Sequence, residues 1–138
     1  MKRINRVAIL LFICFLMGKG SVVEARPSPL EVEPAVYDNV KYTAPHFLES
    51  SNHKQLSGYI EAWDTRTNKK FWELKVYDIK YDPGLEKEAQ EIYITSLRIE
   101  MGKLLVVNEA GDRYEVELGT KKVKKISGDR SQGSVIVK

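Results

Sequence analysis

Hydrophobic and polar residues alternate along much of the chain, most clearly between residues 113 and 118. There, Tyr114, Val116 and Leu118 alternate with charged residues. A period of two places successive side chains on opposite faces of a β-strand, so this segment is predicted to be a strand with one buried face. Residues 104–107 are apolar at every position, which is typical of a strand covered on both faces.

The same alternation occurs earlier in the chain. Ile60 and Ala62 alternate with Tyr59, Glu61 and Trp63. We expect the first two side chains to face a core and the other three to share the opposite face. This segment is predicted to be a second well-defined strand.

Weaker patterns predict the remaining elements and the fold class. One short strand is expected within 36–43, ended by Pro45, and a return strand packed on both faces is expected at 71–79. A further strand starts at Ile92, with Tyr93, Thr95, Leu97 and Ile99 on one face, and an edge strand is expected at 121–126. One short helix is expected at 85–91, capped by Asp82. The prediction is an all-β antiparallel meander that forms a twisted sheet or a small barrel or sandwich, with one short helix.

The first 25 residues differ from the rest and are predicted to be a signal peptide. Three basic residues precede the apolar run 7–17, and Val23 and Ala25 stand before a cleavage point at Arg26. The run has 11 residues, fewer than the roughly 20 that a membrane-spanning helix needs, so no stable membrane insertion is expected after cleavage. The protein is therefore expected to be secreted or periplasmic.

The rest of the chain is predicted to contain one domain. Residues 26–35 hold three prolines and are expected to form an extended linker that adds nothing to a core. The β domain is expected at 36–126, and 127–138 is expected to be a flexible tail. Beyond residue 25 the chain has 18 basic and 18 acidic residues and no Cys, which argues against nucleic-acid binding and excludes disulfides and thiolate metal sites.

Two parts of the chain repeat at an offset of 53 residues. Gly58 corresponds to Gly111, Asp64 to Glu117, Thr67 to Thr120 and Lys69 to Lys122. Each part reads as strand, turn and strand, so the offset indicates a duplicated β unit.

The phrase Gly58-x-x-x-Ala62-x-Asp64-x-x-Thr67-Asn68-Lys69-x-x-Trp72 resembles the repeat of quinoprotein-type (PQQ-like) β-propellers. Residues 94–123 resemble a second blade, although Glu115 and Glu117 replace the usual Ala and Asp and no Trp follows. The resemblance implies two blade-like units. A propeller closes with about four to eight blades, so one copy of this chain is too short for a closed ring, and no quinone or other cofactor is expected.

Aromatic residues gather around the first repeat and supply the candidate binding site. The candidates are Tyr59, Trp63, Trp72 and Tyr77. Most are expected in the core, whereas Tyr59 and Trp63 would form a contact site if they share an exposed face.

Other clusters of polar residues have ordinary interpretations. His46 and His53 lack metal-site spacing, and the carboxylates between Asp78 and Glu88 do not match a calcium loop, so no metal is expected. The lysines between 121 and 125 are expected to protect a sheet edge. No nucleophile stands beside a base, and no catalytic residues are predicted.

Two functions follow from these patterns. The first is an exported, non-catalytic protein-interaction or scaffold module of the cell envelope, which binds an envelope protein or its own copies. The alternative is a small ligand-binding or enzyme-accessory module, either quinoprotein-associated or carbohydrate-binding through Tyr59 and Trp63.

Overall fold

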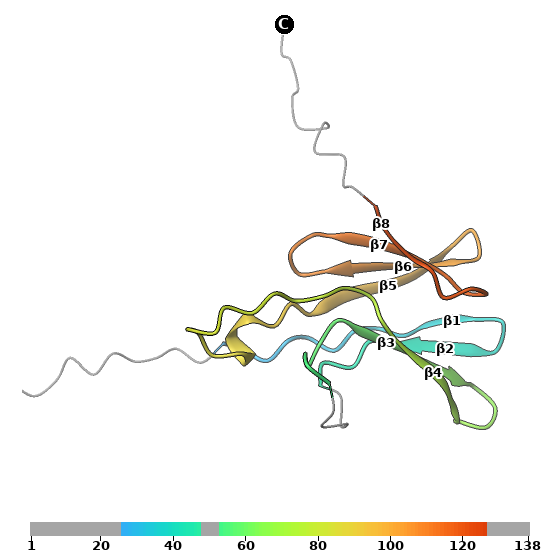
Figure 1. Ribbon diagram of the computed structural model, residues 1–138. Coiled ribbons are helices and arrows are strands. Elements are labelled where there is room, and N and C mark those ends of the chain that lie inside the picture. Colours follow the sequence, from blue (N-terminus) through green and yellow to red (C-terminus); the bar gives the residue numbers. More distant parts are fainter. Residues whose placement is uncertain (1–25, 48–52, 127–138) are drawn as a thin grey trace, which may run out of the picture.

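The computed structural model describes residues 26–47 and 53–126 (Figure 1). The predicted signal peptide at 1–25 and the predicted tail at 127–138 lie outside the described residues, as do residues 48–52.

The described chain forms two four-stranded antiparallel sheets, and each is a simple meander. The first sheet has the order β1-β2-β3-β4 and the second the order β5-β6-β7-β8. The strands are β1 (Ala35–Tyr37), β2 (Val40–Thr43), β3 (Tyr59–Asp64), β4 (Lys70–Lys75), β5 (Ile94–Glu100), β6 (Lys103–Asn108), β7 (Arg113–Glu117) and β8 (Val123–Ile126). The predicted all-β antiparallel fold is confirmed.

The two sheets bury one core between them. In Figure 1 the second sheet lies above the first. The core contains side chains from both sheets. Ile60, Ala62, Leu104, Val106 and Val116 are fully buried there, as the alternation in β3 and β7 predicts. The chain is therefore a two-layer structure with a shared core.

The outer faces of both sheets are mostly polar. Glu61 and Glu73 are paired across β3 and β4 on one outer face, and Arg98, Leu105 and Glu115 form a row across the other. A neighbouring blade would need apolar side chains on these faces. The two layers thus complete the core without a third sheet.

The two halves share a turn geometry that follows the sequence repeat. Gly58 and Gly111, 53 positions apart, have φ of 82° and 81°. The turns after β3 and β7 also have equivalent hydrogen bonds: Asp64 N to Lys69 O and Asn68 N to Asp64 O in the first, and Glu117 N to Lys122 O and Lys121 N to Glu117 O in the second. The sequence repeat therefore corresponds to a structural repeat, while its relation to quinoprotein blades stays a prediction.

The single strand predicted within 36–43 is wrong, because β1 and β2 are separate strands. Asp38 and Asn39 both have positive φ, 48° and 60°, and join the strands in a two-residue turn. Asp and Asn tolerate this left-handed backbone better than most residues. Two-residue turns with positive φ at both positions are the usual connection in a β-hairpin, which is why the chain reverses here.

The segment predicted as a linker at 26–35 contributes to the core, against the expectation that it would not. Val32 is only 6% exposed, and Ala35 begins β1. The prolines prevent hydrogen bonding in a sheet without preventing the side chains between them from packing.

The return strand is shorter than the predicted 71–79. It ends at Lys75, and Phe71 is 55% exposed, so it is not packed on both faces. Beyond it, the buried Gln55 side chain accepts a hydrogen bond from Ile79 N (3.1 Å) and donates to Tyr77 O (2.8 Å). These bonds replace the strand pairing that the pattern predicts.

The predicted helix at 85–91 is reduced to the 3-10 turn η1 (Glu88–Gln90). Asp82 does not cap it, because the Asp82 carboxylate accepts from Gly84 N instead (2.9 Å). Within residues 26–47 and 53–126, no helix has the length and hydropathy to cross a bilayer.

The face predicted for residues 93–99 is also wrong. A register shift between Ile94 and Ser96 interrupts the alternation, so Ile94, Leu97 and Ile99 face inward and Thr95 is exposed. A bulge changes which face a side chain occupies without changing the sequence pattern.

Candidate functional site

The four predicted binding residues lie in two separate places. Tyr59 and Trp63 share the outer face of the first sheet, as the alternation in β3 predicts. Trp72 and Tyr77 lie on the side that faces the second sheet. They do not form one surface.

Trp63 is half-buried among charged side chains. Its Nε1 donates to Glu61 Oε2 (3.0 Å), and Lys70 Nζ lies 5.7 Å from the ring centroid. Hydrogen bonding to Glu61 raises the pKa of Lys70, which keeps this cation charged. Tyr59 is buried beneath His53, with ring centroids 4.8 Å apart. Only Trp63 is therefore available to a ligand on this face.

Trp72 and Tyr77 connect the sheets. The Trp72 ring packs on Tyr42 at 5.9 Å and lies beneath Lys121 Nζ, from the β7–β8 turn, at 5.3 Å. Tyr77 stacks on Tyr114 at 5.2 Å, and burial raises the pKa of its hydroxyl. Both residues act in packing between layers.

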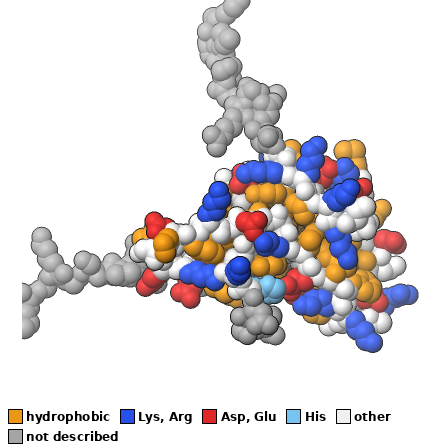
Figure 2. Space-filling model, in the orientation of Figure 1, with side chains coloured by type: hydrophobic (Ala, Val, Ile, Leu, Met, Phe, Trp, Pro, Cys, Tyr) orange, Lys and Arg blue, Asp and Glu red, His pale blue; other side chains and the backbone are white. Residues whose placement is uncertain are grey.

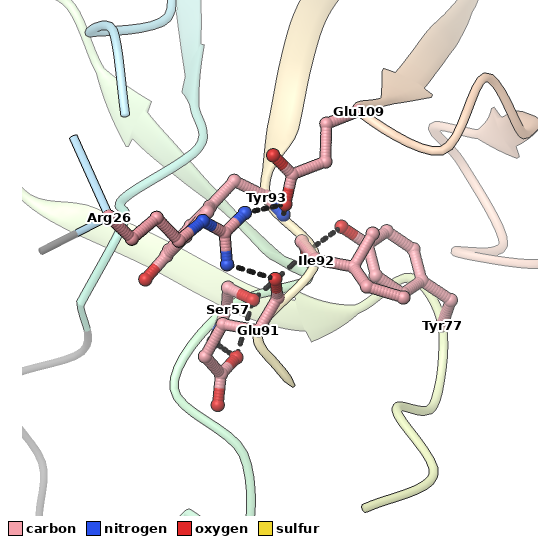
Figure 3. Close-up of polar contacts among 7 residues, drawn as sticks. All are labelled: Arg26, Ser57, Tyr77, Glu91, Ile92, Tyr93 and Glu109. Atoms are coloured by element: carbon pink, nitrogen blue, oxygen red, sulfur yellow. Dashed lines mark hydrogen bonds and ion pairs between the residues drawn. The ribbon is translucent and has the colours of Figure 1, made fainter. Parts of the chain in front are cut away.

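The carboxylate of Glu91 is 2% exposed and lies among several polar partners (Figure 3). It accepts hydrogen bonds from Ser57 Oγ (2.6 Å), Ser57 N (3.0 Å), Leu56 N (3.2 Å) and the Tyr81 hydroxyl. We call these residues the Glu91 cluster. It joins the loop before β3 to the segment before β5.

The Glu91 cluster is suited to structure rather than to chemistry. Ser57 is almost fully buried, and its Oγ also lies 3.0 Å from Ile92 O. Burial and the bond to Glu91 raise the pKa of Tyr81, so this hydroxyl remains a neutral donor. A nucleophile must reach a substrate, and this serine is enclosed by the fold.

Arg26 lies beside the Glu91 cluster and fastens the N-terminal segment (Figure 3). Its guanidinium donates to Glu91 O (2.7 Å) and to the Glu109 carboxylate, and it lies 4.9 Å from the Tyr93 ring centroid. Hydrogen bonding to Glu109 raises the pKa of Arg26. This planar cation is thus held on three sides.

Two shallow grooves flank the N-terminal segment. One of about 270 Å³ is lined by Leu30, Glu31, Tyr93, Ile94 and Glu109, among others. The other, of about 360 Å³, lies between this segment and the end of β2 and shares Glu31. The first is below the usual range for a ligand pocket, roughly 300–1,000 Å³, and the second is at its lower end. Glu31 contributes a carboxylate to both.

Exposed apolar side chains gather at the opposite end, where the hairpins turn. Met101 is 98% exposed and Tyr37 is 46% exposed, and a Cβ at Gly102 would lie 3.8 Å from the Tyr37 hydroxyl. Phe71 is exposed at the start of β4. Figure 2 shows hydrophobic and basic side chains intermingled at this end of the molecule.

The remaining candidates from the sequence have local partners. His46 Nε2 lies 2.7 Å from Leu30 O, and His53 Nε2 lies 3.0 Å from Glu73 Oε1. No group of three or more His, Cys, Asp or Glu in the part of the chain that the structure describes is arranged to hold a metal ion. Of the lysines on the β8 edge, Lys125 pairs with Asp112 (2.9 Å).

Sequence reasoning missed Glu91, Arg26 and Met101. Arg26 and, apart from Tyr81, Glu91 gain their partners from residues more than 30 positions away, which no local pattern shows. Met101 did leave a signal. An apolar residue before Gly102 in a two-residue turn is unusual, because such turns favour Asn-Gly or Asp-Gly.

Comparisons with known proteins supply no family. No protein-family model matches the chain, and no curated protein matches it. Function therefore has to be argued from the geometry.

Proposed function

We propose that this chain is an exported, non-catalytic module of the cell envelope that binds another protein or its own copies. The observation that carries the proposal is the pair of exposed side chains Met101 and Tyr37 at the turns of two adjacent hairpins. Apolar side chains grouped on an exposed surface are typical of interaction sites.

The distribution of polar groups supports this proposal. Ser57 and Glu91 are enclosed and bonded to each other, so they are not available to a substrate. The outer faces of the sheets are mostly polar. Most of the exposed large apolar side chains lie at the two ends of the molecule, with Val36 on the outer face of the first sheet as an exception.

Affinity capture of the tagged full-length chain from its own host tests the proposal. The comparison is wild type against Met101→Asn, with Leu85→Asn as the control, because Leu85 is also exposed but lies in a different loop. We expect an envelope protein or an untagged copy to be recovered with wild type and the control but not with Met101→Asn. Equal recovery with all three would contradict the proposal.

A second candidate function, carbohydrate binding, is favoured by one observation. Trp63 presents a half-buried ring beside Glu61 and Lys70, and such aromatic and polar combinations suit sugar rings. A change in tryptophan fluorescence on addition of oligosaccharides, absent in Trp63→Ala, would favour this function over protein binding.

A further inference from the structure

Met101 has a conformation and an exposure that local stability does not explain. Its φ is 48°, in the left-handed region, which costs a residue with a Cβ roughly 1 kcal/mol. The corresponding turn of the first sheet has Asp38 and Asn39, which suit that backbone. A fully exposed Met in a strained turn therefore indicates that Met101 has a function other than stabilising the turn.

The end that carries Met101 is basic. We define the hairpin end as residues 37–41, 64–71, 99–103 and 117–123, which contain seven Lys or Arg and four Asp or Glu. Three of these carboxylates have partners within their own turn or strand: Asp64 bonds Thr67, Glu117 bonds Thr120, and Glu100 pairs with Arg98. Three of the seven cations also have partners, because Arg66 pairs with Asp64, Lys70 with Glu61 and Lys103 with Glu115. The net positive charge of this end therefore comes from Lys41, Lys69, Lys121 and Lys122.

The opposite end is acidic and hollowed. We define the loop end as residues 26–34, 44–47, 53–58, 76–93 and 109–112, which contain four Lys or Arg and nine Asp or Glu. It includes the groove of about 270 Å³ beside Tyr93, whose rim carries Glu31 and the 90% exposed Leu30. Because Glu109 is paired with Arg26, the groove combines apolar walls with the negative charge of Glu31.

Strand β5 places these two features at opposite ends of the molecule. Ile94, at the start of β5, lines the groove, and Met101 follows its last residue. At about 3.3 Å per residue, the seven residues of β5 separate the two features by about 20 Å. One molecule cannot bring its own hairpin end into its own groove.

We propose that copies of this chain associate head to tail, with the Met101 turn of one copy seated in the Tyr93 groove of the next. This inference specifies the partner of the proposed function and rests on it. Opposite net charges at the two ends favour this orientation and oppose contact between two like ends. The contact is heterologous, so it leaves a free end on each side and forms chains or rings.

An anionic lipid surface is a less suitable partner for the hairpin end. Lipid would leave the acidic groove without a role. The same experiment distinguishes the two partners.

The test is sedimentation velocity of the chain as its host produces it, over a range of concentrations. We expect species larger than a dimer to grow with concentration, and the association to weaken about tenfold or more between low and high salt. Met101→Asn should weaken association about tenfold or more while raising the melting temperature, because Asn-Gly suits this turn. A purely structural role for Met101 would not produce this combination.

A mixing experiment tests the direction of the contact. The Met101→Asn variant keeps its groove, whereas a variant carrying Leu30→Lys and Glu31→Lys keeps its hairpin end. Each should remain monomeric alone, and an equimolar mixture should form a one-to-one complex that grows no further. Both exposed substitutions in the second variant leave the core intact.

Three outcomes would overturn the inference. A groove variant that still dimerises alone would indicate contact between like ends. A wild-type chain that stays monomeric yet captures an envelope protein through Met101 would exclude self-association and retain the proposed function. A monomer that binds anionic but not neutral vesicles would assign the hairpin end to lipid.

Discussion

The two sheets place glycines of the same conformation in different surroundings. Gly58 and Gly111 have almost equal φ, and each lies just before the third strand of its sheet. A Cβ at Gly58 would lie 2.9 Å from both the Gln55 amide and the Tyr77 ring, whereas a Cβ at Gly111 would meet nothing within 4 Å. The local geometry is shared and the packing is not.

The residues before these glycines differ in the same way. Ser57 is held by Glu91, while Ala110, at the equivalent position, is exposed. At this position the first half of the repeat therefore bonds to Glu91 and connects the two layers, whereas the second half forms only a hairpin turn. A repeated β unit has acquired two roles through its tertiary contacts.

The largest expected effect on stability comes from removing the Glu91 carboxylate, which bonds to Ser57 and has no counterpart at Ala110. Glu91→Ala leaves two backbone amides and the Tyr81 hydroxyl without their acceptor, and leaves Ser57 Oγ with Ile92 O alone, so we expect a loss of about 4 kcal/mol in the free energy of unfolding. Chemical denaturation measures it. Glu88→Ala is the control, because Glu88 is exposed three residues earlier. Equal losses of stability in Glu91→Ala and Glu88→Ala would mean that the hydrogen bonds of the Glu91 cluster do not stabilise the fold.

The glycine pair gives the next largest difference. Gly58→Ala combines backbone strain with close contacts to Gln55 and Tyr77, and should cost about 3 kcal/mol. Gly111→Ala carries only the strain, about 1 kcal/mol. Thermal and chemical unfolding of both variants checks the comparison. Similar losses at the two positions would show that Gly58 is less enclosed than the structure indicates.

Trp72 and Lys125, also 53 positions apart, provide a third comparison. Trp72→Ala removes a partly buried ring that contacts Tyr42 and Lys121, and should cost about 2 kcal/mol. Lys125→Ala removes an exposed ion pair with Asp112 and should cost less than about 0.5 kcal/mol. Denaturation midpoints measure both. A larger loss of stability for Lys125→Ala than for Trp72→Ala would contradict the conclusion that Trp72 packs between the layers and Lys125 forms an exposed ion pair.

The smallest expected effect concerns acid sensitivity in the turn after β3. A hydrogen bond from Arg66 N holds the pKa of Asp64 below its usual value of 3.8. Because the folded-state pKa is lowered, ionised Asp64 stabilises the fold above this usual value, and the contribution disappears as the pH falls through the lower folded-state pKa. Asp64→Asn should therefore remove part of the stability lost in acid.

Unfolding of Asp64→Asn across acid pH measures this effect. At neutral pH, Asp64→Asn should destabilise the protein more than Glu117→Gln. Among residues 26–47 and 53–126, the Glu117 carboxylate accepts a hydrogen bond from the Thr120 hydroxyl alone, whereas that of Asp64 accepts from Arg66 N and the Thr67 hydroxyl. If Asp64→Asn lost as much stability in acid as the wild type, titration of Asp64 would not contribute to the acid sensitivity of the fold.

The sequence predicted the strands whose side chains alternate strictly or are apolar throughout. β3, β6 and β7 have the faces expected of them, since burial on one side leaves a direct pattern. It did not predict the bulge after Ile94, which changes the face of β5 without a local signature. Nor did it predict that Val32 would join the core between prolines.

The candidate site was predictable only in part. The alternation in β3 placed Tyr59 and Trp63 on one face correctly, but His53 covers Tyr59 through a contact that depends on a loop. The hairpin end is formed by turns from both sheets, so its exposed side chains become neighbours only in the folded protein. Tertiary contacts decided which aromatic residues remained accessible.

The most direct test of the account compares an end of the molecule with a face. A photo-reactive residue is placed at Tyr37, in the hairpin end, or at Arg98, whose exposed side chain lies on the outer face of the second sheet. After irradiation of the producing host, we predict protein adducts from position 37 and none from position 98. Adducts from position 98 alone would contradict the central claim that the chain binds its partners through its ends.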